Sequence, residues 1–146
     1  MIAVVATLAA GLWTTVPGAW SPDAELVQKM QDEVQAGFEL QAPLVGPKAP
    51  QWPNYSFQIR AEIWRDRKTI FVHGVCQRFL EHFDMTRWQV VSDGGPCFFQ
   101  AKYDAENGKI FDFMFNGPYV PSRPSSKATV APSVALPSST PPVQRN

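Results

Sequence analysis

The stretch from residue 54 to 117 is unusually rich in aromatic residues: 13 of its 64 residues are phenylalanine, tyrosine or tryptophan. A domain of about 60 residues buries only about 60% of the surface that its unfolded chain exposes. We therefore expect that this stretch cannot conceal all of its rings alone. Another part of the chain, a second copy of it or an apolar ligand must cover some of them.

Three segments of this stretch have the pattern of β-strands. Residues 56–64 alternate between apolar side chains at the odd positions and mostly polar ones at the even positions, which is typical of a half-buried strand. Residues 98–103 and 110–115 flank a turn that contains Asn107-Gly108, and this pair supplies the positive φ of a tight hairpin. The charged run at 65–68 and Gly94-Gly95-Pro96 are predicted to be turns.

Residues 69–83 carry two conflicting signals. Apolar residues recur at helical spacing from Val72 to Phe83, which indicates a helix. Several β-branched residues, a glycine at 74 and the lack of a capping residue oppose a helix. Interpreted as β structure, residues 69–81 and 86–92 form a second hairpin that turns at 82–85. Both interpretations stay open at this point.

The flanking segments complete the predicted organisation. Ser21-Pro22-Asp23 can begin a helix, and the apolar side chains that follow recur every three or four residues, so residues 20–42 are predicted to form an amphipathic helix. Residues 43–53 hold four prolines and are predicted to be a linker. Residues 118–146 are rich in proline and serine and are predicted to be disordered. We therefore expect a mainly β fold, an antiparallel sheet of four or five strands within residues 54–117 that follows the N-terminal helix.

The first 19 residues have the layout of a secretory signal peptide. An apolar run is followed by small residues, and cleavage is predicted near Gly18 or Ala19. The uninterrupted apolar run is about a dozen residues long, whereas a membrane-spanning helix needs about 20. We therefore expect a secreted protein with no membrane span after processing.

Two further features fit an extracellular chain. Cys76 and Cys97 are the only cysteines, and an even pair in an exported protein predicts a disulfide bond. Asn54 begins an Asn-Tyr-Ser triplet, which is an acceptor sequence for N-glycosylation. The sequence thus predicts a disulfide-bonded glycoprotein.

Interpreted as β structure, the string from Leu80 to Val91 resembles a strand–turn–strand element of ependymin-related proteins. In that family an aromatic residue and an aspartate are followed by an arginine and alternating apolar positions, and Phe83-Asp84 and Arg87 stand in those places. The resemblance covers about residues 56–116. It implies a curved antiparallel sheet similar to the bacterial lipoprotein-carrier fold, and the binding of an apolar or lipid-like ligand.

Interpreted as a helix followed by a loop, the same region resembles a cystatin. Residues Gln89 to Gly94 then take the position of the inhibitory Gln-x-Val-x-Gly loop, although Asp93 stands where that motif has its glycine. This alternative implies an α+β fold and a protease inhibitor that acts through the 89–95 loop. A charged Asp93 would be costly in a desolvated protease cleft unless it were paired.

The sequence gives no support for catalysis, for a cofactor or for a metal. His73, Cys76, His82 and Cys97 match no common spacing of zinc ligands, and no pair of carboxylates stands out for acid–base chemistry. The formal net charge of zero, together with predicted export, disfavours nucleic acid as a partner.

We therefore predict a non-enzymatic secreted protein. It would bind an apolar small molecule or a partner protein, or form a homodimer, through an aromatic face of the sheet. The residues that we expect on this face are Phe57, Ile59, Ile63, Phe99, Phe111, Phe113 and Phe115.

Overall fold

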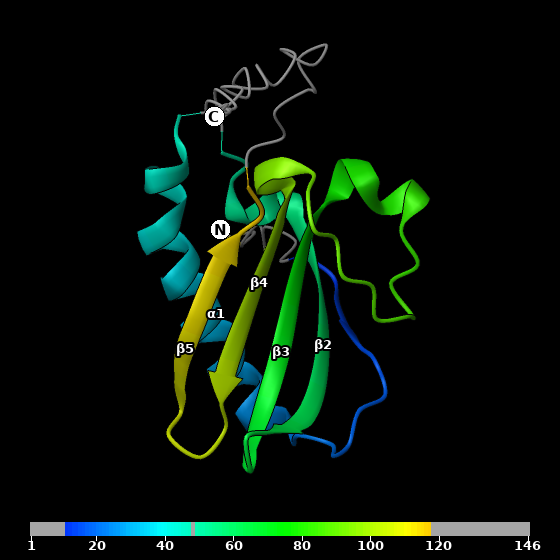
Figure 1. Ribbon diagram of the computed structural model, residues 1–146, viewed down its shortest axis with the longest axis vertical. Helices are drawn as coiled ribbons and strands as arrows, with labels where there is room; N and C mark the ends of the chain where they lie inside the picture. The colour runs from blue at the N-terminus through cyan, green and yellow to red at the C-terminus, as the bar shows by residue number, and fades with distance from the viewer. Residues whose placement is uncertain (1–10, 48, 118–146) are drawn as a thin grey trace, which may run out of the picture.

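A computed structural model describes residues 11–47 and 49–117 (Figure 1). The described chain contains one long helix, five strands and three short 3₁₀ helices. In chain order these are β1 Trp13–Thr15, α1 Ala24–Val45, η1 Trp52–Asn54, β2 Tyr55–Trp64, β3 Arg67–Cys76, η2 Gln77–His82, η3 Gly95–Cys97, β4 Phe98–Asp104 and β5 Lys109–Phe115.

The five strands form one sheet in the order β1-β2-β3-β4-β5. Strands β2 to β5 pair antiparallel with their neighbours, whereas β1 pairs parallel with β2, so the sheet is mixed. The expected class, mainly β with an N-terminal amphipathic helix, is confirmed in these coarse terms. The expectation of a purely antiparallel sheet is wrong because of β1.

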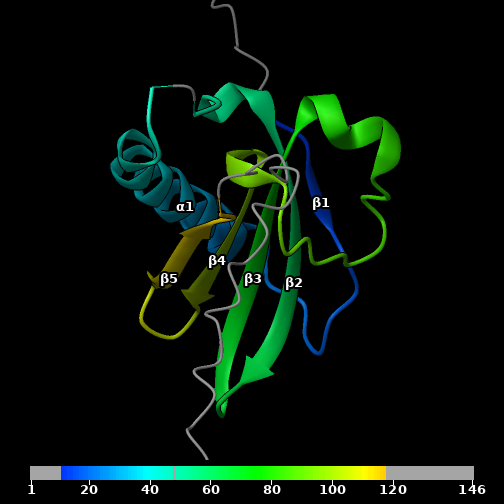
Figure 2. The ribbon, with the colours of Figure 1, turned by 45° about the horizontal axis from the view of Figure 1, so that its top comes forward.

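Helix α1 covers one face of the sheet (Figure 2). Its buried side chains are Met30, Val34 and Phe38, spaced one helical turn apart, and they pack against core residues such as Phe99 of β4. The side chain of Asp23 caps the helix by accepting a hydrogen bond of 2.8 Å from the backbone N–H of Leu26. This helix therefore hides the face on which most of the strands' apolar residues lie.

The predicted boundaries of the helix and of the linker need correction. The helix begins at Ala24 and continues through Pro43 to Val45, so the segment 43–53 is not wholly a linker. Pro43 lies in the last turn, and its missing N–H deprives the helix of one hydrogen bond shortly before the helix ends. The 3₁₀ helix η1 also falls within the predicted linker.

A long connection, residues 77–97, covers part of the other face of the sheet. The amide nitrogen Nε2 of buried Gln58 donates to the carbonyl oxygens of Met85 at 2.8 Å and Arg87 at 2.7 Å. The Cys76–Cys97 disulfide joins the two ends of the connection, as predicted from the cysteine pair. We call residues 77–97 the cover segment.

The helix interpretation of residues 69–83 is wrong, and the β interpretation is correct for residues 69–76 but wrong beyond Cys76. Strand β3 ends at Cys76, residues 77–82 form a 3₁₀ helix, and residues 86–92 are not a strand. Strand β3, with its β-branched residues, pairs along the whole of β2. A helix at this position would lose these inter-strand hydrogen bonds. The helical spacing arose because this strand is apolar on both faces, one under α1 and the other under the cover segment.

The structure also places part of the predicted leader in the sheet. The N–H of Val16 donates to the carbonyl of Ile59, and that of Ala19 to the carbonyl of Ala61, each at 2.8 Å. The Trp13 ring stacks on that of Phe57 with centroids 4.1 Å apart. Cleavage near residue 18 or 19 would therefore remove β1. Residues 1–10 of the predicted leader and residues 118–146 of the predicted tail lie outside the described residues.

Candidate functional site

The seven residues predicted to form one aromatic face do not share a surface. Phe57, Ile59 and Phe99 are buried core residues beneath α1. Phe113 and Phe115 are partly buried, and both contact Phe99. For these five residues the predicted exposed face is wrong. The alternating pattern correctly located the apolar face of the strands, but α1 covers that face.

Only Ile63 and Phe111 of the predicted set are exposed, with 54% and 47% of their surfaces accessible. Phe111 lies in β5 opposite a register shift, since Lys102 pairs with Asp112 and Tyr103 pairs with Ile110. A bulge of this kind leaves one extra residue and redirects its side chain. The ring of Phe111 thereby meets the ring of Trp64.

An open cavity of about 710 Å³ lies where the β2–β3 and β4–β5 hairpins end. This volume is within the usual range for small-molecule sites, about 300–1,000 Å³. We call it the hairpin pocket. Its lining residues are Trp64, Arg65, Arg67, Thr69, Asp104, Asn107, Lys109, Ile110 and Phe111.

Two stacked rings form the apolar part of the hairpin pocket. The rings of Trp64 and Phe111 are 5.5 Å apart, with an angle of 25° between their planes. The guanidinium of Arg65 lies 4.2 Å from the Trp64 ring centroid, and the Nζ atom of Lys102 lies 5.2 Å from it. Cations over an indole face are attracted by its quadrupole, so these contacts hold Trp64 in place.

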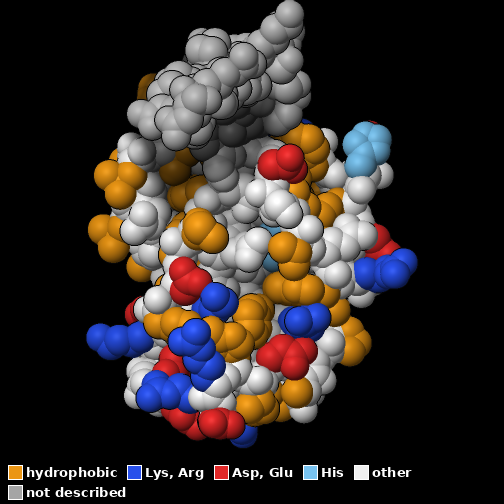
Figure 3. Space-filling view, in the orientation of Figure 1, with side chains coloured by type: hydrophobic (Ala, Val, Ile, Leu, Met, Phe, Trp, Pro, Cys, Tyr) orange, Lys and Arg blue, Asp and Glu red, His pale blue; other side chains and the backbone are white. Residues whose placement is uncertain are grey.

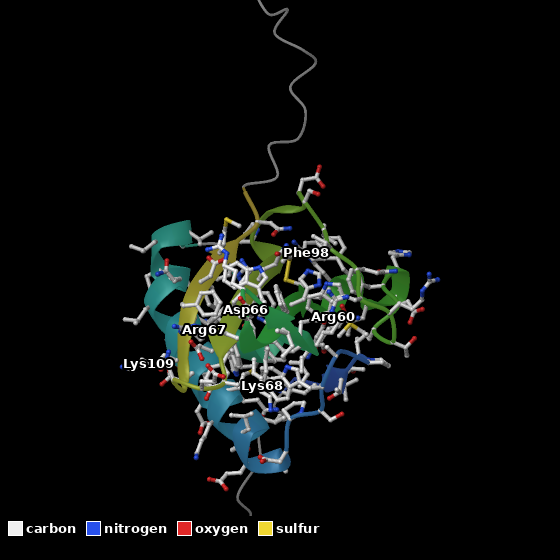
Figure 4. All side chains as sticks on the ribbon, turned by 60° about the horizontal axis from the view of Figure 1, so that its bottom comes forward. Arg60, Asp66, Arg67, Lys68, Phe98 and Lys109 are labelled. Carbon is white, nitrogen blue, oxygen red and sulfur yellow. A yellow bond between two sulfur atoms is a disulfide. The ribbon has the colours of Figure 1, made fainter. Side chains whose placement is uncertain are left out.

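Charged side chains surround these rings. Figure 3 shows charged side chains of both signs gathered with hydrophobic ones over the hairpin ends, in the lower half of the molecule. Among the residues that line the hairpin pocket, three are cationic and one is anionic. In Figure 4, Asp66, Arg67 and Lys68 come from the β2–β3 hairpin, and Lys109 comes from the neighbouring hairpin. The site is therefore both aromatic and basic.

Asp104 is the one carboxylate among the residues that line the hairpin pocket. Its oxygens accept from the backbone N–H groups of Glu106 and Asn107, at 2.9 and 3.0 Å, and from Arg67 Nη1 at 2.8 Å. The hydrogen bond from the Asn107 backbone, followed by that from Arg67, lowers the pKa of Asp104 below its ordinary 3.8. Asp104 thus stays ionised and fixes the turn of the β4–β5 hairpin.

The tip of the β2–β3 hairpin has an unfavourable backbone conformation. Arg65 and Asp66 have φ angles of 49° and 63°, and within the described chain they are the two non-glycine residues with positive φ. This region costs L-amino acids roughly 1–2 kcal/mol per residue, less for aspartate. Such local strain often accompanies a functional site.

Sequence reasoning missed most of the hairpin pocket. Trp64, Arg67 and Lys109 were not among the predicted site residues, and the run 65–68 was interpreted only as a charged turn. One signal could have found it. Two-residue turns between strands require positive φ and usually contain glycine or asparagine, whereas the turn here contains neither.

The other predicted sites occupy separate places. Asn54 is exposed at the end of η1, and nothing in the structure tests its glycosylation. Val90 of the predicted inhibitory loop is 62% exposed, but Asn116 at the end of β5 donates to the carbonyls of Val91 and Asp93. The 89–95 segment is therefore part of the cover segment, tied to β5, and is not a hairpin tip.

Two general properties can be reported for residues 11–47 and 49–117. No group of three or more His, Cys, Asp or Glu side chains in this part of the chain is arranged to hold a metal ion. None of its helices has the length and hydropathy required to cross a membrane.

No family model matches the chain, and neither the curated proteins nor the solved structures contain a significant match. The ependymin-related and cystatin resemblances therefore remain predictions.

Proposed function

We propose that this protein is a non-enzymatic binding protein that takes an apolar, lipid-like ligand in the hairpin pocket. The observation that carries the proposal is the stacked Trp64–Phe111 pair, which borders a cavity of about 710 Å³ instead of packing in the core. Phe111 is 47% exposed although α1 conceals several other rings of the same sheet. An apolar ligand would cover the two rings and remove their surface from water.

The chemistry of the lining residues supports binding over catalysis. Asp104 is engaged by backbone and side-chain donors, which leaves it poorly placed to act as a base. The cysteines are joined in a disulfide and supply no nucleophile.

Displacement of a dansyl-labelled fatty acid tests the proposal. The unmodified protein should bind the probe with enhanced dansyl fluorescence, and Trp64→Ala should weaken binding at least ten-fold. Leu44→Ala is the matched control because Leu44 is 78% exposed and does not line the hairpin pocket. Equal binding by Trp64→Ala and the unmodified protein would rule out this pocket.

We also propose that the protein is secreted, which the disulfide and the exposed Asn54 support in a general way. The position of β1 adds a constraint, since a mature chain that begins at residue 19 or 20 would lack it. Mass spectrometry of the exported protein would locate its first residue. A mature chain that begins before Gly11 would preserve the sheet, whereas one that begins at Trp20 would show that the exported domain lacks β1.

The protease-inhibitor alternative concerns the exposed Val90 and its neighbours. It requires that the protein inhibit a papain-type protease and that Gln89→Ala abolish this inhibition. Absence of inhibition at micromolar concentration would remove this alternative. The result would leave the hairpin pocket proposal unaffected, because Gln89 does not line that pocket.

A further inference from the structure

We infer that the hairpin pocket selects amphiphiles with a single acidic group, and that Arg65 and Lys109 bind this group. The inference rests on the proposed function, since it concerns the head group of the same ligand. It starts from the charges that line the pocket: Arg65, Arg67 and Lys109 are cationic and Asp104 is anionic, which leaves an excess of two positive charges.

The pairing of these charges identifies the cations that remain available. Arg67 is engaged with Asp104, its Nη1 atom lying 2.8 Å from Oδ2. Nearby on the same face of the sheet, Lys102 pairs with Asp112 at 2.7 Å. Among the described residues, Arg65 and Lys109 form no ion pair. These two side chains are therefore free to meet an anion.

The positions of the two free cations suit a head-group site. Arg65 is held against Trp64 with its guanidinium 4.2 Å from the ring centroid, so its charge lies beside the apolar surface of the pocket. Lys109 comes from the opposing hairpin and begins β5, two residues before Phe111. Both cations thus line the same pocket as the two rings, and a chain lying on the rings would place its polar end toward the hairpin tips.

Desolvation favours an acid over a neutral polar group at this position. A ligand that covers Trp64 and Phe111 also removes water from the cations beside them, and burying a charge without a partner is costly. A carboxylate offsets that cost through charge-assisted hydrogen bonds. We expect about a ten-fold preference for the acid, which corresponds to about 1.4 kcal/mol and is within what two exposed ion pairs can contribute.

The acidic residues nearby limit the ligand to one negative charge. Asp104 lines the pocket, and Asp66 stands beside Arg67 at the hairpin tip in Figure 4. A polyanion would bring its additional charges close to these carboxylates, and like charges repel at such distances. A fatty acid or another monocarboxylate with an apolar body fits this arrangement.

The test compares decanoic acid with decanol, which has the same chain length and no charge. Both would displace Nile red, a neutral probe, from the full chain at pH 7.5. The unmodified protein should bind the acid about ten-fold more tightly than the alcohol. Arg65→Gln/Lys109→Gln should bring the two affinities within two-fold of each other by weakening binding of the acid alone.

The matched control is Lys29→Gln/Lys68→Gln, which removes two positive charges outside the hairpin pocket and should preserve the preference for the acid. Equal affinities for acid and alcohol in the unmodified protein would overturn the head-group inference, and the proposed function would stand if Trp64→Ala lost both ligands. Failure of both ligands to bind would overturn the proposed function itself.

Discussion

Acid should destabilise this protein through His73, which lies in the middle of the sheet. Its side chain is 1% exposed, beneath the cover segment, and is surrounded by the rings of Phe83, Trp88 and Phe98. Neither ring nitrogen has a hydrogen-bond partner among the described residues. Burial therefore disfavours the charged imidazolium and lowers the pKa of His73 from 6.5 to about 4.

The direction of the effect follows from proton binding. Between pH 6.5 and about 4 the unfolded chain binds a proton at His73 and the folded chain does not, so the free energy of unfolding falls as the pH falls. Each pKa unit corresponds to about 1.4 kcal/mol, and the shift from 6.5 to about 4 therefore corresponds to a loss of about 3 kcal/mol. Asp84 and Asp104 have lowered pKa values, and their contributions are lost below the ordinary aspartate pKa of 3.8.

Urea unfolding followed by tryptophan fluorescence at a series of pH values between 7 and 4 measures this loss. His73→Leu should be at least as stable as the unmodified protein at pH 7 and should lose little stability down to pH 4.5. His82→Gln is the matched control because His82 is exposed, and it should keep the full pH dependence. The reasoning would be refuted if His73→Leu retained the same loss as the unmodified protein.

Three further predictions concern the turn, the cover segment and the disulfide. Arg65→Asn/Asp66→Gly replaces the strained tip with the residues that such turns prefer and should raise the free energy of unfolding by about 1 kcal/mol in urea melts. Gln58→Leu leaves two carbonyls of the cover segment without their donor and should cost about 1–2 kcal/mol, with faster hydrogen exchange there. Cys76→Ser/Cys97→Ser should cost about 3 kcal/mol, measured by thermal unfolding, because the disulfide closes a loop with a sequence separation of 21.

The parts of the fold with local signals could be predicted from the sequence. Alternation located β2, the Asn-Gly turn located the β4–β5 hairpin, and helical periodicity located most of α1. The disulfide followed from the cysteine count. The strand, the hairpin and the helix each depend on residues that are close in sequence. The disulfide could be predicted because the chain has two cysteines, which can pair in one way.

The remaining parts depend on contacts between distant segments. Residues 11–19 have the composition of a leader. Their place along the edge of the sheet depends on hydrogen bonds to β2, which is distant in the sequence. Gly74 stands in β3 because the Phe99 ring occupies the space that a side chain would need there. An alternating strand has an apolar face, but the sequence does not show whether that face is exposed or covered. Here α1 packs on it, so Phe57 and Phe99 belong to the core.

A ligand in the hairpin pocket should cover Trp64, and the chain supplies its own probes because it has five tryptophans, each with an indole N–H. A ¹H–¹⁵N NMR titration with decanoic acid would follow these five signals separately. The account predicts a large, saturable shift of the Trp64 indole signal and little change for Trp13, Trp20 and Trp52. Shifts concentrated at Trp52, or no saturable shift at Trp64, would contradict it.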